Sequence, residues 1–197
     1  NVQTRESLLK NAQEKFKTGR FDTNAALTED QVKLLKQQRS LEDTLREPIV
    51  GKSLHETVKL LLLQNEIKLA ENLRSEYKIP DRRYWWLRIQ CLAEKNSWGD
   101  LEKFSKSKKS PIGYEPFVEE CLKYGNRTEA KKYLPKVREE LKVKYLAKLS
   151  MLSEAAQVAY EQKDSNALSF VLAQCGPSDR AVADKINGMI ASLRTGK

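Results

Sequence analysis

A recurring helical pattern constrains the fold of this chain more than any single motif does. From residue 54 onward, apolar residues at helical spacing alternate with short polar turns, and a second helical stripe follows each turn. The turns fall at Gln64-Asn65, Lys95-Asn96, Gly125-Asn126 and Lys163-Asp164. The first three lie about 30 residues apart, a length typical of a two-helix hairpin, and the fourth is spaced less strictly. Each turn also contains a competent N-cap. The pattern predicts an all-α fold, namely an α-solenoid of stacked antiparallel helical hairpins.

The same pattern predicts how the chain is organised. Residues 53–197 carry the hairpin repeats, whereas residues 1–47 are more polar and form peripheral N-terminal helices. Because no Pro/Gly/Ser-rich linker divides the chain, we expect one C-terminal α-solenoid fragment over residues 1–197. The first residue is Asn1 and not methionine, so we expect this to be a piece of a longer protein.

Several helix starts are marked by capping residues. Capping-box patterns occur at Thr28–Gln31 and Ser53–Glu56, and the first predicts a helix from about Glu29 to Pro48. Asp81 is the expected N-cap of a further helix, which has apolar residues on more than one side and should pack between neighbours. Its two stripes are Trp85, Ile89 and Leu92, and Tyr84, Leu87 and Cys91.

Composition narrows the classes of possible partner but does not select one of them. The chain has 36 Lys and Arg against 27 Asp and Glu, a formal charge of +9, which admits nucleic acid, anionic lipid or an acidic protein as partner. Three separated cysteines in apolar surroundings are typical of buried thiols. The single histidine, His55, is predicted to be a surface residue, and one histidine cannot form a metal cluster with such distant cysteines. Since no catalytic motif is present, we expect neither enzymatic activity nor a metal or cofactor.

The lysine-rich stretch "SKSKKSPIGYEPF", residues 105–117, allows two interpretations. It could bind phosphate as a basic patch, or it could be a joint that sets the angle between two helices. Gly113 permits an unusual turn and Pro116 suits the first turn of the following helix, so we favour the joint.

Two further features are locally unusual. Arg82 and Arg83 stand in the first turn of a helix, where cations oppose the helix macrodipole. They could pair with Glu66 or Glu76, or they could bind an acidic groove on a partner. Ala25 and Ala26 precede the predicted start at Glu29, so they could allow close approach of another surface or belong to an ordinary connection.

Taken in order, three segments resemble a known family. "IPDRRYWWL" at residues 79–87, "LEKFSKSKKSPIGY" at 101–114 and "EAKKY" at 129–133 are similar to the C-terminal region of the sixteenth vacuolar protein sorting subunit, which the HOPS and CORVET tethering complexes share. The resemblance spans essentially the whole chain and weakens over residues 1–20 and 135–197. The N-terminal β-propeller of that family does not occur in this sequence.

The resemblance implies a scaffold rather than a catalyst. It implies a heterodimer with a Sec/Munc-type, SNARE-binding subunit and contacts with other HOPS and CORVET core subunits. Roughly residues 1–93 would contact the Sec/Munc-type subunit, with Ala25, Ala26, Arg82 and Arg83 as interface residues. The expected location is cytoplasmic, peripheral on late endosome and lysosome or vacuole membranes, with indirect membrane contact and no nucleic-acid partner. The alternative is a basic helical module that binds anionic lipid or nucleic acid directly.

Overall fold

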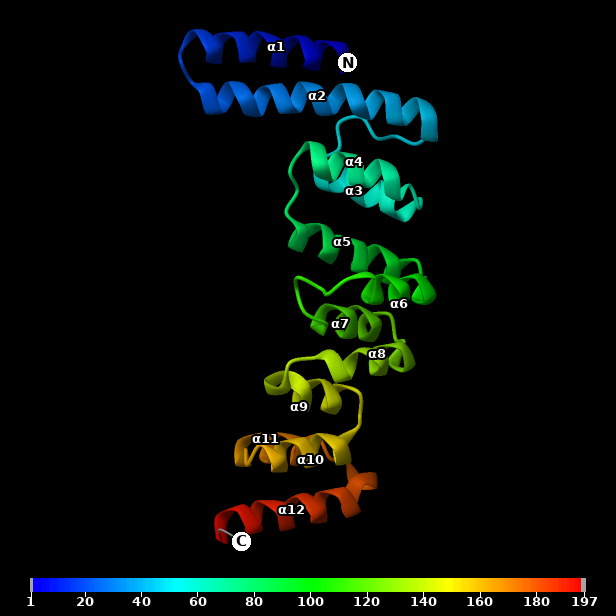
Figure 1. Cartoon of the computed structure of the whole chain (residues 1–197), viewed down its shortest axis with the longest axis vertical. Coiled ribbons are helices and arrows are strands. Elements are labelled where there is room, and N and C mark those ends of the chain that lie inside the picture. The colour runs from blue at the N-terminus through cyan, green and yellow to red at the C-terminus, as the bar shows by residue number, and fades with distance from the viewer. Residues whose placement is uncertain (1, 196–197) are drawn as a thin grey trace. The chain divides into compact units, whose positions relative to one another are not determined.

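The computed structural model describes residues 2–195, which form twelve α-helices and two short 3₁₀ helices, without a strand (Figure 1). This confirms the all-α, solenoid-type fold class. The α-helices are α1 Val2–Thr18, α2 Asp22–Leu45, α3 Leu54–Leu63, α4 Ile67–Glu76, α5 Asp81–Glu94, α6 Trp98–Ser107, α7 Glu115–Lys123, α8 Arg127–Tyr133, α9 Glu139–Lys148, α10 Leu152–Glu161, α11 Ser165–Leu172 and α12 Arg180–Thr195. The 3₁₀ helices are η1 Leu134–Lys136 and η2 Pro177–Asp179.

The chain divides into two compact units, Asn1–Cys91 and Leu92–Lys197. The boundary lies within α5, and each unit is described on its own. That residues 1–197 form one continuous solenoid therefore remains a prediction.

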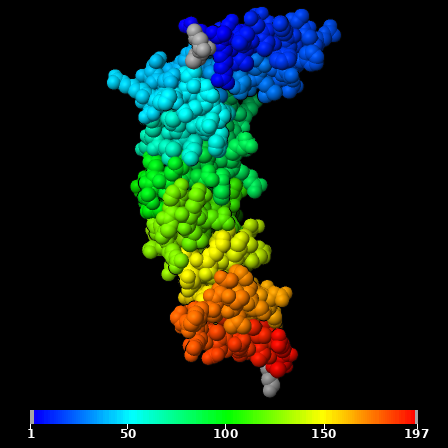
Figure 2. Space-filling view, turned by 180° about the vertical axis from the view of Figure 1, so that it is seen from behind, coloured from blue at the N-terminus to red at the C-terminus, as the bar shows by residue number. Residues whose placement is uncertain are grey.

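In the first unit, α1 and α2 lie side by side as a long hairpin, and α3 and α4 form a shorter one (Figure 1). In the space-filling view the surface of the α1–α2 hairpin continues into that of α3 and α4 of the same unit (Figure 2). Side chains from α3, α4 and α5 form a buried apolar cluster, against which Leu41 and Leu45 of α2 also pack. The cluster consists of Val58, Leu61, Leu62, Ala70, Leu73, Tyr84, Leu87 and Cys91.

The predicted start of the second helix is wrong. α2 begins at Asp22, and Thr28 lies inside it, where its hydroxyl donates a hydrogen bond to the Asn24 carbonyl at 2.7 Å. Threonine can satisfy its hydroxyl within a helix in this way, so the capping-box pattern is not specific. The helix ends at Leu45, before the predicted Pro48, and Arg46 follows it in the left-handed region with φ 54°.

The second capping box is confirmed, and the predicted cap at Asp81 is not. The Glu56 amide donates to Ser53 Oγ at 3.2 Å, and the Ser53 amide donates to Glu56 Oε2 at 2.8 Å. Asp81 is itself the first residue of α5, and its carboxylate pairs with Arg74 of α4. Asp81 therefore joins α4 to α5.

All four predicted turns connect two helices, which confirms the hairpin pattern. Each contains a residue with positive φ: Asn65 at 65°, Asn96 at 55°, Gly125 at 74° and Lys163 at 55°. At the first, the Asn65 amide donates to the Leu62 carbonyl at 3.2 Å and the Glu66 amide donates to the Leu61 carbonyl at 2.8 Å. This is the Schellman arrangement, which satisfies the last carbonyls of a helix.

The Schellman turns correct the role assigned to two asparagines. Asn65 and Asn96 end a helix, so they do not act as N-caps. Asn126 and Asp164 do cap, because Asn126 Oδ1 accepts from the Glu129 amide at 3.0 Å and Asp164 Oδ1 accepts from the Ala167 amide at 2.9 Å. The same residue types mark the turns but serve opposite ends of the helices.

Replacing Lys163 with glycine is expected to raise the free energy of unfolding by about 0.5–1 kcal/mol, because glycine has no Cβ penalty at positive φ. Circular dichroism during chemical denaturation measures this change. The matched control is Lys144→Gly inside α9, where the same substitution should cost about 1 kcal/mol. Destabilisation by both variants would contradict the assignment of the turn.

In the second unit, Phe117 of α7 is fully buried at the centre of an aromatic cluster. Its ring centroid lies 6.4 Å from that of Phe104, 5.5 Å from that of Tyr114 and 5.0 Å from that of Tyr133. The cluster thus joins α6, α7 and α8 through side chains from all three helices. Elsewhere in the unit, consecutive helices pair from α9 to α12.

The lysine-rich stretch connects α6 to α7, as the joint interpretation predicted. Gly113 has φ 79°, and a Cβ placed there would collide with Glu115 Oε2. Pro116 lies in the first turn of α7. Of the cysteines, Cys91 and Cys121 are buried as predicted, whereas Cys175 is half-exposed.

Candidate partner-binding site

The four predicted interface residues all lie in the first unit, on α2 and α5. Ala26, Arg82 and Arg83 are exposed. Ala25 is only 4% exposed, so its side chain is not available to a partner. The sequence had suggested that both alanines precede the helix. In the structure they lie inside α2.

Arg82 and Arg83 do not pair with Glu66 or Glu76. Across residues 2–195, the structure shows no ion pair and no side-chain hydrogen bond for either arginine. Glu76 is already engaged, because Lys33 Nζ lies 2.6 Å from its Oε1. The two cations therefore project from the first turn of α5 without an internal counter-charge.

A polar network joins α2 to the end of α4 at this surface. Tyr77 donates its hydroxyl proton to Gln37 Oε1 at 2.6 Å, and the Gln37 amide donates to Glu76. Ala26 and Lys33 are seven positions apart on α2 and so share one helix face. The face that presents Ala26 thus continues through Lys33 to Tyr77.

The network also determines the charge states of its members. Hydrogen bonds from Lys33 and Gln37 lower the pKa of Glu76, and the hydrogen bond to Glu76 raises the pKa of Lys33. Burial, with a smaller effect from the charge of Glu76, raises the pKa of Tyr77 to about 12. At neutral pH the surface therefore carries an ion pair beside an uncharged phenol.

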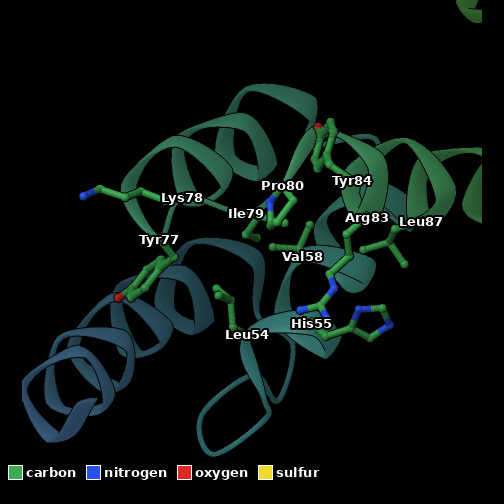
Figure 3. Close-up of a pocket in the computed structure, with 10 residues that line it drawn as sticks. All are labelled: Leu54, His55, Val58, Tyr77, Lys78, Ile79, Pro80, Arg83, Tyr84 and Leu87. Carbon is green, nitrogen blue, oxygen red and sulfur yellow. The ribbon is translucent and has the colours of Figure 1, made fainter. Parts of the chain in front are cut away.

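Next to Tyr77 the first unit contains a hollow of about 170 Å³ (Figure 3). It lies between α3, the connection from α4 to α5, and α5 itself. Arg83 and His55 lie close together on one side of it, and Lys78 points away (Figure 3). The lining residues are Leu54, His55, Val58, Tyr77, Lys78, Ile79, Pro80, Arg83, Tyr84 and Leu87.

The backbone at the end of α4 contributes to this hollow. Lys78 has φ 50°, and the Ile79 amide donates to the Arg74 carbonyl at 2.9 Å, so α4 ends in a tight turn. Pro80 then leads into α5, whose Tyr84 amide donates to the Pro80 carbonyl at 3.1 Å. Sequence reasoning placed His55 on the surface, where it is, but did not predict the hollow. The break at Lys78-Ile79-Pro80 was the available signal.

Two lysines of α6, just before the α6–α7 joint, are partly neutralised. Lys103 Nζ lies 3.4 Å from Asp100 Oδ1, and Lys106 pairs with Glu102. Lys132 Nζ of α8 also lies 2.5 Å from Glu102 Oε2. Hydrogen bonds from Lys106 and Lys132 lower the pKa of Glu102 to about 2. Part of the apparent basic patch is therefore an internal ion-pair network.

Within residues 2–195, no three His, Cys, Asp or Glu side chains are grouped so that they could bind a metal ion. In the same part of the chain, none of the helices combines the length and apolar character required to span a bilayer.

Comparison with known proteins identifies the family. The family described as "Vps16, C-terminal region" matches residues 1–192. A vacuolar protein sorting-associated protein 16 homolog of Drosophila melanogaster is 46% identical over 153 residues, covering 78% of this chain and 18% of that protein. The homolog of Dictyostelium discoideum is 44% identical over 168 residues, covering 84% of this chain and 20% of that protein.

More distant similarity extends to fungi. The vacuolar protein sorting-associated protein 16 of Saccharomyces cerevisiae is 27% identical over 137 residues, covering 68% of this chain and 17% of that protein. The chain spans about a fifth of the length of the curated relatives it matches. Since the family match covers nearly every residue, the chain belongs to the Vps16 family and corresponds to its C-terminal region.

Proposed function

We propose that this chain is a scaffold region of a vacuolar tethering complex, and that its first unit binds the Sec/Munc-type subunit of that complex. It acts without catalysis, by holding a SNARE-binding partner in the HOPS and CORVET assemblies, where it also meets other core subunits. Its place is on the cytoplasmic side of late endosome and lysosome or vacuole membranes, which it reaches through its partners. Membership of the Vps16 family supports the assignment to vacuolar sorting.

The observation that carries the proposal is the pair of exposed, unpaired arginines at the start of α5. Within the described chain, Arg82 and Arg83 have no internal counter-charge, although the helix macrodipole disfavours cations in a first turn. An arginine side chain can bind a carboxylate with two parallel hydrogen bonds, which makes an acidic partner surface its natural complement. Such a locally unfavourable pair is typical of a binding surface.

Ala26 provides a second contact point on the same unit. Its small side chain is exposed on α2, where it allows close approach of another surface. Introducing a charge there would place an unpaired carboxylate in the contact, which is destabilising when it is desolvated. Ala25 is buried, so we assign the contact to Ala26 alone of the two alanines.

Co-purification with the Sec/Munc-type subunit tests the proposal. Ala26→Asp, and Arg82→Glu combined with Arg83→Glu, should each weaken binding by at least about tenfold, since like charges across an interface repel. Matched controls at exposed positions of the same unit are Thr23→Asp in α2 and Lys68→Glu in α4. Binding that is unchanged in both test variants, with cooperative thermal unfolding retained, would refute the assignment.

Direct lipid or nucleic-acid binding is the competing outcome. Flotation with phosphatidylserine vesicles and gel shifts with RNA and DNA at physiological salt measure it. Strong, salt-sensitive binding in either assay, together with no binding of the Sec/Munc-type subunit, would replace the proposed function.

A further inference from the structure

We propose that the hollow beside Arg83 is an anchor pocket, which receives an aliphatic or aromatic side chain from a partner segment that carries an aspartate or glutamate beside it. This inference rests on the proposed function and names the chemistry of the segment that the Sec/Munc-type subunit would insert. It assigns a binding role to Leu54 and Ile79, and a second role to Val58 and Leu87, which also belong to the buried cluster of the first unit.

The size and lining of the hollow suit an apolar side chain. Its volume is about 170 Å³, and an apolar cavity of about 150 Å³ is known to hold benzene. Val58 is fully buried, and Tyr84 and Leu87 are 2% and 4% exposed, so they provide a rigid inner wall. Leu54, Tyr77 and Ile79 are half-buried, so the hollow opens to solvent between them. Interfaces commonly draw much of their binding energy from one side chain inserted into such a pocket.

The charge at the rim favours an acidic neighbour for that side chain. Arg83 carries a permanent positive charge, none of the described lining residues is a carboxylate, and the Lys78 side chain points away from the hollow. Arg83 and His55 lie close together on the same side (Figure 3). A carboxylate placed beside the inserted side chain would meet the Arg83 guanidinium, which has no internal counter-charge in the described chain. Complementary charge of this kind also excludes basic segments.

Filling the hollow tests its role. Leu54→Trp should occupy the space and weaken binding of the purified Sec/Munc-type subunit by at least about tenfold in calorimetry. The matched control is Leu63→Trp, because Leu63 lies on the same helix and packs against the same core cluster but does not line the hollow. Circular dichroism melts report whether each variant folds.

The charge requirement is tested separately, so the proposal stays falsifiable if Leu54→Trp does not fold. Arg83→Gln should weaken binding about fivefold or more and reduce its salt dependence, since one ionic contact is lost. Lys68→Gln, an exposed lysine on α4, is the control for the change in net charge. A benzophenone side chain at position 55, on the same side of the hollow as Arg83, should crosslink to a partner segment with an aliphatic or aromatic residue within about two positions of Asp or Glu.

The outcomes separate the two proposals. If the unmodified chain binds but folded Leu54→Trp and Arg83→Gln bind equally well, the anchor pocket is refuted and the proposed function stands. A crosslink to a segment without acidic residues also refutes the pocket. If the unmodified chain does not bind the Sec/Munc-type subunit, the proposed function fails and the pocket assignment fails with it.

Discussion

Replacing Phe117 with alanine is expected to lower the free energy of unfolding of the second unit by about 3–5 kcal/mol. The Phe117 ring is fully buried and contacts aromatic rings from α6, the α6–α7 joint and α8. Its removal takes away apolar burial and leaves a cavity that the surrounding rings can fill only in part. Chemical denaturation followed by circular dichroism measures the loss.

Phe170 provides the matched control for this prediction. It is also a phenylalanine of a helix in the second unit, but 44% of it is exposed. Phe170→Ala should therefore cost less than about 1 kcal/mol, because little burial is lost. Equal losses in the two variants would show that the aromatic cluster does not hold α6, α7 and α8 together.

Replacing Gln38 with leucine is expected to destabilise the first unit by about 2–4 kcal/mol. Gln38 is fully buried in α2, where its amide donates to the Lys52 carbonyl and to Thr57 Oγ1, both at 2.8 Å. Its carbonyl accepts from the Gly51 amide at 3.0 Å. Leucine would remove a partner of the buried Thr57 hydroxyl and of two part-buried backbone groups, the Lys52 carbonyl and the Gly51 amide, and a polar group that is left unsatisfied on burial costs about 1–3 kcal/mol.

Hydrogen exchange gives this prediction a local readout. The Gly51 amide should exchange at least about tenfold faster in Gln38→Leu, since its acceptor is lost. Gln31→Leu is the control, because Gln31 lies on the same helix with an exposed side chain. If Gly51 exchange and stability are the same in both variants, Gln38 does not fasten the α2–α3 connection.

The Gln38 contacts also bear on the candidate site. They tie α2, which carries Ala26 and Lys33, to the connection that leads into α3. α3 in turn provides Leu54, His55 and Val58 to the hollow. The sequence does not show that Gln38 binds this connection, because its partners approach it only when residues 51–57 fold against α2.

The hairpin pattern illustrates what local sequence can predict. Apolar residues at helical spacing and polar turns are read from neighbouring positions, and the turns at residues 64–65, 95–96, 125–126 and 163–164 do join helices. The capping box at Ser53–Glu56 is local in the same sense and is present. Thr28 shows where such local prediction fails. Its hydroxyl donates to the Asn24 carbonyl inside a longer helix, so it does not mark a helix start.

The candidate site was predicted in part. The macrodipole argument and the family resemblance both pointed to Arg82 and Arg83, and the structure leaves both exposed and, among the described residues, unpaired. Whether they bind a partner stays a prediction. Ala25 and Ala26 could not be told apart in the sequence, because only the packing of the first unit buries one methyl group and exposes the other.

The sequence by itself therefore determined the all-α class, the hairpin spacing and the family, since each depends on local periodicity, turn chemistry or matched residues. Only the tertiary structure decided which polar side chains are paired, which alanine is exposed and where the hollow lies. Helix formation depends on backbone hydrogen bonds between residues three or four apart. A surface hollow depends on how separate helices pack, and its walls come from residues 54 to 87, too far apart for any local pattern to relate.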